Sequence, residues 1–164
     1  MKEFDYELDY KSLDFTDAET RQLYRIGRGE QGVLLVRPYT NDIGAHWRFR
    51  TVSIAEESSR AIYNLYQGYR QDKDFIGMDM CRKFLEMGFT RSRRYANHTS
   101  GQKYETKPPY YHKGDRGGTP IRPQEPDALT NEKAYCAAIF KTVRDLVVAD
   151  PIYKQMRQEW RSNE

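Results

Sequence analysis

Cations and aromatic rings are interleaved in residues 90–122. Eight lysines and arginines stand there against two acids, together with four tyrosines and two histidines. Cations can neutralise phosphates and flat rings can stack on bases, which is the chemistry of single-stranded nucleic-acid binding. The residues expected to do this are Arg91, Arg93, Arg94, Tyr95, His98, Lys103, Tyr104, Lys107, Tyr110 and Lys113. A polyanion, most plainly single-stranded nucleic acid or RNA, is therefore the favoured partner.

A glycine motif at residues 27–32, GRGEQG, has the letters of a dinucleotide-binding loop. Such a loop follows a strand and opens a helix. Here a helical pattern precedes the motif and the apolar run VLLV follows it. The kinase signatures that could accompany a glycine loop are also missing from the sequence. A tight turn is the favoured interpretation, and a backbone nest that contacts phosphate is the alternative.

The HWRFR run at residues 46–50 predicts a strand with two different faces. Trp47 and Phe49 would face the core, whereas Arg48 would lie on the outer face beside His46. That face is either solvated or binds an anion. Arg48, Arg94, His46 and His98 are also the candidates for an enzyme acting on a phosphorylated small molecule. No metal-ligand spacing or intact cofactor fingerprint occurs, so neither a metal nor a cofactor is expected.

The net charge of +3 hides an asymmetry along the chain. The first 20 residues carry seven acids against two lysines, whereas residues 90–122 are strongly basic. The two segments can attract each other within one molecule or between two. A protein-interaction module, which docks an acidic partner or the acidic segment of a second copy, is therefore the main alternative function.

Three segments predict a small antiparallel sheet in the first third of the chain. Phe4, Tyr6, Leu8 and Tyr10 alternate with acids, which is the period of a half-buried strand. Residues 33–37 and 46–50 predict two more strands, joined by a turn rich in Pro, Asn, Asp and Gly. The expected fold class is α+β, with about four helices packed on this sheet.

Helix signals dominate the rest of the chain. Ser53 with Glu56 forms a capping box, and Asp74 caps a second helix that Gly88 would end. Thr90 would begin a further short helix. Residues 127–149 predict a long helix, and Asp150 followed by Pro151 begins the last one.

One domain is expected for residues 1–164, with residues 99–126 as a long surface loop because they are rich in Pro and Gly and poor in aliphatic side chains. Two cysteines without metal-type partners suit a reducing compartment. The acidic first residues do not resemble a signal peptide, and no apolar run approaches the roughly 18 residues of a membrane span. A cytoplasmic location without membrane contact is expected.

Three blocks of sequence together resemble a known family. They are YRIGRGEQGVLLVRPY at residues 24–39, HWRF at 46–49, and GFTRSRRYANH followed by SGQKY within 88–104. The chain is similar to a group of small bacterial, algal and cyanobacterial-phage proteins catalogued only as a domain of unknown function. The resemblance implies an intracellular single-domain protein, phage-encoded in some cases, and assigns no catalytic residues.

Overall fold

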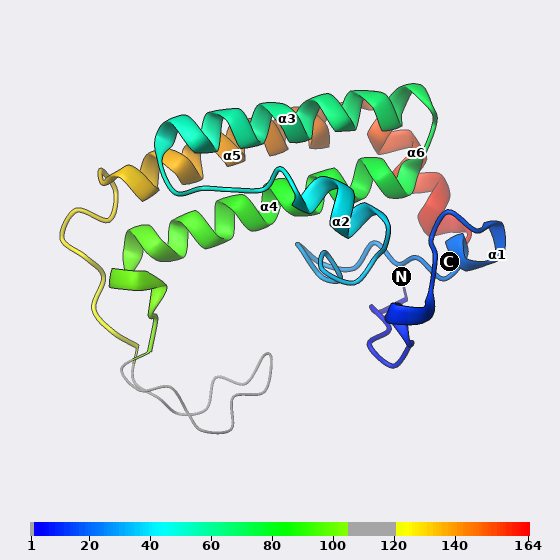
Figure 1. Cartoon of the computed structure of the whole chain (residues 1–164), viewed down its shortest axis with the longest axis horizontal. Coiled ribbons are helices and arrows are strands. Elements are labelled where there is room, and N and C mark those ends of the chain that lie inside the picture. The colour runs from blue at the N-terminus through cyan, green and yellow to red at the C-terminus, as the bar shows by residue number, and fades with distance from the viewer. Residues whose placement is uncertain (1, 105–120) are drawn as a thin grey trace.

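The structure is a computed structural model that describes residues 2–104 and 121–164. Within these ranges the chain forms helices joined by turns (Figure 1). The α-helices are α1 (Ala18–Arg21), α2 (Tyr39–Gly44), α3 (Val52–Gln71), α4 (Phe75–Asn97), α5 (Glu132–Ala149) and α6 (Pro151–Ser162). Two 3-10 helices, η1 and η2, span Tyr10–Ser12 and Thr99–Gly101.

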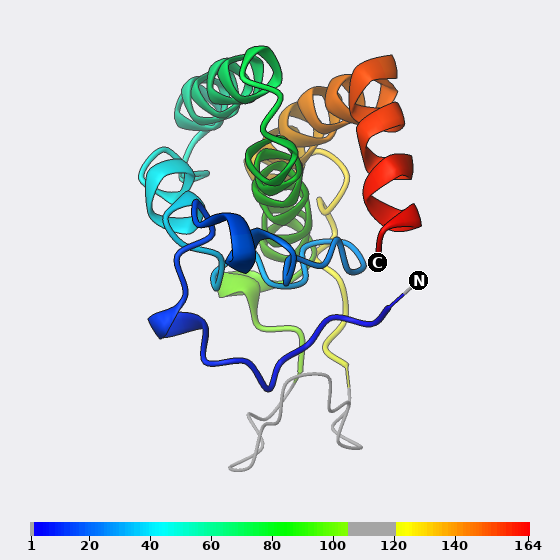
Figure 2. The ribbon, with the colours of Figure 1, turned by 90° about the vertical axis from the view of Figure 1, so that its right-hand side faces the viewer.

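Helix α4 is the centre of the molecule. Seen end-on in Figure 2, it lies between α3 and α5, while the N-terminal segment crosses beneath it. Its first eleven residues, 75–85, are all buried. A helix that is buried on every side belongs to a core rather than to a surface. Helix α4 contributes lining residues to two basic pockets.

The predicted sheet is wrong. In the described ranges the only β-pairing is an isolated bridge between Tyr104 and Ile121. The first segment lacks a partner strand, and its aromatic residues instead join a row of stacked rings. Phe4 and Tyr10 have ring centroids 5.8 Å apart, and Tyr10 lies 6.1 Å from Phe15. Tyr6 is 47% exposed, so the alternation does not mark one buried face.

The other two predicted strands are also wrong. Residues 33–37 form turns in which Val33 and Val36 are buried while Leu34 is exposed, a spacing of three rather than two. The predicted connecting turn is helix α2 instead. Residues 46–50 form irregular backbone between a turn and a bend, although Trp47 and Phe49 do pack against the core as expected. An α+β class is therefore replaced by an almost entirely helical architecture in the described ranges.

The helix starts agree better with the sequence. Asp74 caps α4 by accepting from the Gly77 N–H at 3.2 Å, and Asp150 caps α6 with Pro151 in its first turn. The start of α3 differs by two residues, because Thr51 is the cap rather than Ser53. Helix α5 begins after Asn131, later than the predicted residue 127.

Gly88 does not end a helix. Helix α4 continues through it to Asn97 and absorbs the short helix predicted to start at Thr90. A Cβ atom on Gly88 would lie 2.4 Å from Cδ1 of Phe140, so glycine is present because α5 approaches α4 closely there. Contact between helices, rather than backbone conformation, explains this glycine.

The predicted loop at residues 99–126 lies mainly outside the described residues, since 105–120 are not described. Its described start contains η2, and its described end is joined to α4 through a bond from the Glu125 N–H to the Asn97 carbonyl at 2.8 Å. Among the helices of the described ranges, none combines the length and the apolar character that a membrane crossing requires.

Candidate functional site

A basic pocket of about 500 Å³ lies at the C-terminal end of α4, and we call it the α4-end pocket. One wall is a single face of α4, because residues three and four apart share a face of a helix. The opposite wall comes from the chain on both sides of residues 105–120. The lining residues are Phe89, Thr90, Arg93, Arg94, Asn97, His98, Lys103, Ile121 and Gln124.

Arg93 and Arg94 are held in place by neighbouring polar groups. The Arg93 Nε donates to Oδ1 of Asn97 at 3.1 Å, and its Nη2 donates to the carbonyl of Ala128. The Arg94 Nε donates to the Gly101 carbonyl at 2.7 Å. A guanidinium carries five N–H donors, so each arginine keeps donors for a ligand. These contacts orient both cations and leave some of their N–H donors free to bind a ligand.

His98 is buried. Only 5% of its surface is accessible, and its Nδ1 atom has no hydrogen-bond partner among the described residues. The chain reverses directly after it through Ser100 and Gly101, whose φ angles are 57° and 70°. The imidazole belongs to the wall of the α4-end pocket, where little of it is accessible to solvent.

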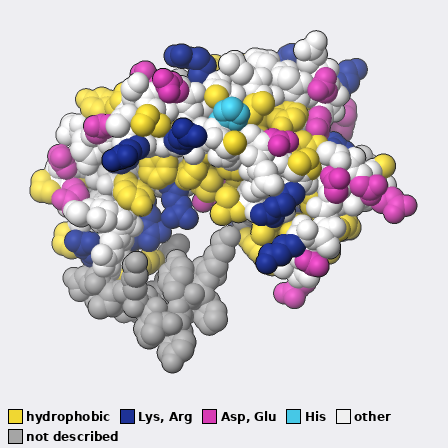
Figure 3. Space-filling model, in the orientation of Figure 1, with side chains coloured by type: hydrophobic (Ala, Val, Ile, Leu, Met, Phe, Trp, Pro, Cys, Tyr) yellow, Lys and Arg dark blue, Asp and Glu magenta, His cyan; other side chains and the backbone are white. Residues whose placement is uncertain are grey.

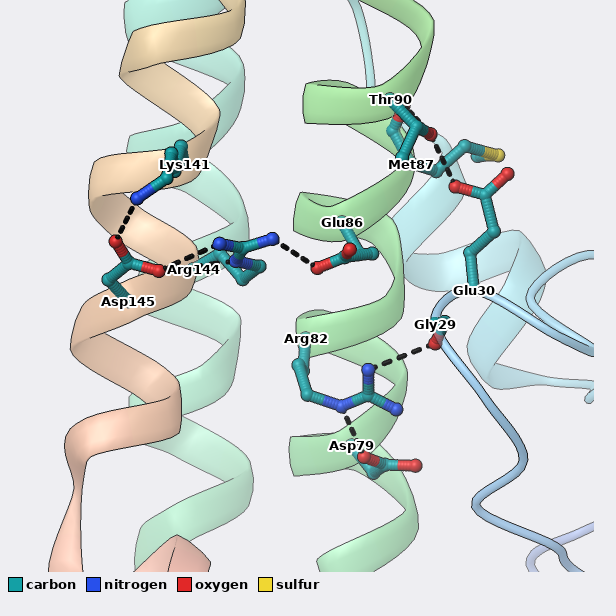
Figure 4. Close-up of polar contacts among 10 residues, drawn as sticks. All are labelled: Gly29, Glu30, Asp79, Arg82, Glu86, Met87, Thr90, Lys141, Arg144 and Asp145. Carbon is teal, nitrogen blue, oxygen red and sulfur yellow. Dashed lines mark hydrogen bonds and ion pairs between the residues drawn. The ribbon is translucent and has the colours of Figure 1, made fainter.

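The lining of the α4-end pocket is basic without an acid in the described ranges. At its rim the Thr90 hydroxyl donates to the Glu30 carboxylate at 2.6 Å (Figure 4). On the face seen in Figure 3, Lys and Arg side chains are interspersed with Asp and Glu rather than merged into one patch. Positive charge is therefore concentrated in the lining of the pocket, whereas it is mixed with negative charge on the face that Figure 3 shows.

The other predicted site residues either do not line the α4-end pocket or lie outside the described ranges. Arg91 is exposed on α4 but does not line the pocket. Tyr95 packs against Phe49, with ring centroids 5.5 Å apart, on a different side of α4. Arg48 is exposed, and its backbone N–H donates to the Ser58 hydroxyl at 3.0 Å. Three further predicted residues lie outside the described ranges: Lys107, Tyr110 and Lys113.

Tyr104 remains close to the pocket. The Lys103 ammonium lies 5.7 Å from the centroid of its ring, and its backbone pairs with Ile121. Lys103 and Ile121 both line the pocket, so the described residues before and after 105–120 lie at the pocket rim.

The glycine loop contacts α4 at two places, through Gly29 and through Glu30. Gly27, Gly29 and Gly32 have positive φ angles, as the tight-turn interpretation requires. The Gly29 carbonyl accepts a hydrogen bond from Arg82 at 2.9 Å. Arg82 precedes His98 by sixteen residues, about 24 Å along a helix. The Gly29 part of the loop is therefore distant from His98, whereas Glu30 of the same loop contacts Thr90 at the rim of the α4-end pocket.

A buried charged cluster in the N-terminal half of α4 was missed from the sequence. Asp79 is inaccessible, pairs with Nε of Arg82 at 2.7 Å, and lies 4.0 Å from Nζ of Lys83. The hydroxyls of Tyr24 and Tyr153 also donate to its carboxylate. The signal was present as an acid followed at i+3 and i+4 by two cations inside an otherwise apolar helix.

Burial and charge shift the pKa values in this cluster. Burial alone would raise the pKa of Asp79, but Arg82 and Lys83 more than offset it and lower the value to about 2. Burial lowers the pKa of Lys83 to about 7, despite the nearby carboxylate. For Arg82, burial opposes the charged form, yet Asp79 raises the pKa above the ordinary value. The cluster therefore holds Asp79 and Arg82 as an ion pair at neutral pH.

The described chain is a helical protein whose central helix carries a buried ion pair and ends in a basic pocket. It belongs to the family described as Domain of unknown function (DUF4385), whose model matches residues 5–163. No curated protein and no solved structure matches the chain. In the described ranges, no group of three or more His, Cys, Asp or Glu side chains is placed to hold a metal ion.

Proposed function

We propose that this protein binds single-stranded nucleic acid through the α4-end pocket and the basic residues of segment 90–122. The observation that carries the proposal is the position of Arg93, Arg94 and Lys103 in one pocket whose described lining has no acid. The sequence of residues 105–120, which connects Tyr104 to Ile121, contains three cations, two acids, two tyrosines and a histidine. We also propose that the protein is cytoplasmic and that its family occurs in bacteria, algae and cyanobacterial phages.

The arrangement suits phosphate contacts better than base recognition. Arg93 and Arg94 are fixed by their own bonds to Asn97, Ala128 and Gly101, so less side-chain freedom is lost when they contact a phosphate. Tyr104 offers a ring on which a base can stack, next to a cation. Such contacts carry little sequence information, so weak base preference is expected.

A fluorescence-anisotropy titration with a labelled single strand of about 16 nucleotides tests the proposal. Measured at about 50 and 200 mM salt, the affinity should fall steeply, because every neutralised phosphate releases counterions. An acidic protein partner, the main alternative, predicts no oligonucleotide binding at either salt concentration. Absence of binding at the lower salt would therefore reject the proposal.

A matched pair of triple variants locates the site. Replacing Arg93, Arg94 and Lys103 with Gln should weaken binding and flatten the log–log salt slope by about two units, at roughly 0.7 per phosphate contact. The control replaces Arg60, Arg91 and Lys11, which are exposed and lie outside the pocket. Thermal melting of both variants checks that each remains folded. Equal weakening by the two variants would show that total charge, not the pocket, binds the strand.

A further inference from the structure

A second and larger basic pocket, of about 640 Å³, lies between α6 and the neighbouring parts of α4 and α5. We call it the α6 pocket. Its volume is within the range of about 300–1,000 Å³ that small-molecule sites occupy. The lining residues are Arg82, Val148, Tyr153, Lys154, Arg157, Gln158, Arg161 and Ser162. Neither the nucleic-acid proposal nor the family match accounts for it.

Four of these lining residues are cations, and none of those described is an acid. Lys154, Arg157 and Arg161 follow at i, i+3 and i+7, so they share one face of α6. None of these three takes part in an ion pair among the described residues. Three unpaired cations on one helix face repel one another, and an anion between them relieves that repulsion.

Arg82 is the most deeply placed of the four cations. Its side chain is 9% exposed, with Nε bound to Asp79 and Nη1 bound to the Gly29 carbonyl (Figure 4). Its Nη2 atom is buried and has no partner among the described residues, and the same holds for Nη1 of Arg161. An unmade donor on a buried charged group is costly, and an oxyanion supplies the acceptor that it needs.

The α6 pocket is separate from the α4-end pocket. Arg82 and Arg93 are eleven residues apart, about 17 Å along the helix. Between them on α4, Glu86 accepts from Arg144 at 2.7 Å, and Arg144 also contacts Asp145 at 3.0 Å (Figure 4). These carboxylates interrupt the positive charge. A long polyanion would have to cross them, whereas a small ligand in the α6 pocket would not.

We propose that the α6 pocket binds a small oligophosphate ligand. Its phosphate oxygens accept from the guanidinium groups of Arg82, Arg157 and Arg161, and Lys154 adds a fourth positive charge. Guanidinium groups match the geometry of phosphate oxygens and can bind two of them at once. Asp79 stays behind Arg82, where it keeps that guanidinium charged and oriented.

Isothermal titration calorimetry with inorganic triphosphate tests this site in the full chain. Saturable binding of one triphosphate per protein is expected at about 150 mM salt. The Arg157→Gln, Arg161→Gln double variant should bind at least about tenfold more weakly, because it loses charge-assisted hydrogen bonds. The Nε–H signal of Arg82 in nuclear magnetic resonance spectra should shift on addition of triphosphate to the unmodified protein.

Two control variants make the outcome decisive. Arg60→Gln with Arg91→Gln removes the same charge from exposed positions outside both pockets and should change affinity by less than about twofold. Arg93→Gln with Lys103→Gln should weaken oligonucleotide binding and leave triphosphate binding unchanged. Dissociation constants above about 1 mM for the unmodified protein, or equal weakening by all three double variants, would overturn the proposal.

Discussion

The carboxylate of Asp79, near the N-terminal end of α4, accepts a hydrogen bond of 2.7 Å from the hydroxyl of Tyr153 in α6. Tyr24, from the N-terminal segment, donates to the same carboxylate. One inaccessible acid therefore joins three parts of the chain that are far apart in sequence. Its ionic partner, Arg82, reaches both the glycine loop and the α6 pocket, so the stability of the fold and the proposed oligophosphate site depend on the same group.

Replacing Asp79 with Asn should lower the free energy of unfolding by about 3–5 kcal/mol, because Arg82 and Lys83 would remain buried without their carboxylate. Urea denaturation measures the change. Asp145→Asn is the control, since Asp145 also contacts a lysine and an arginine but is half exposed. That variant should lose less than about 1 kcal/mol. Similar losses in both would contradict a special role for the buried acid.

Lys83 should make stability rise with pH above neutrality. Its pKa is about 7 in the folded protein and 10.5 in the reference state, so between these values the unfolded chain binds the proton that the folded chain has released. Relative to Lys83→Met, the unmodified protein should gain about 2 kcal/mol of unfolding free energy between pH 7 and 9. Below pH 7 both states are protonated and the difference should level off.

Urea denaturation at pH 6, 7, 8 and 9 tests that dependence, and Lys141→Met is the matched control. Lys141 is exposed and pairs with Asp145 at 2.9 Å, so its removal should leave the pH profile unchanged between pH 6 and 9. If the unmodified protein and Lys83→Met show parallel profiles, Lys83 keeps its proton in the fold and the predicted release is wrong.

Gly88→Ala should destabilise the protein by about 1–3 kcal/mol, although alanine is the better helix former. The added methyl group would meet the ring of Phe140 at 2.4 Å and force α4 and α5 apart. Gly68→Ala provides the comparison, because a Cβ there meets nothing within 4 Å, and should stabilise α3 by about 0.5–1 kcal/mol. Thermal melting of the two variants should therefore shift in opposite directions.

Tyr104→Leu should weaken oligonucleotide binding by about 1–3 kcal/mol while leaving the salt slope nearly unchanged, because a stacking ring contributes without neutralising a phosphate. Anisotropy titrations at several salt concentrations separate the two effects. Tyr135→Leu removes a tyrosine that is 58% exposed on α5, away from the pocket, and should have no effect on binding. A changed slope in the Tyr104 variant would mean that the substitution also displaces Lys103.

Local signals predicted the starts of α4 and α6 correctly, whereas the strands predicted from alternation are wrong. Asp74 and Asp150 cap helices as expected, because a cap depends on bonds to residues two or three positions away. A strand needs a partner elsewhere in the chain, and the alternation at Phe4, Tyr6 and Tyr10 has none in the described ranges. Stacking on Phe15 and packing against the core decide the conformation of that segment instead.

The sequence by itself determined where α4 and α6 begin and where basic and aromatic residues concentrate, since both depend on neighbours along the chain. Only the tertiary structure decided which cations act together. It gathered Arg93, Arg94 and Lys103 in one pocket, left Arg91 outside, and placed Arg82 and Arg157, 75 positions apart in sequence, in the lining of another. The physical reason is that burial and charge pairing depend on packing between helices, and one segment's periodicity does not specify its neighbour.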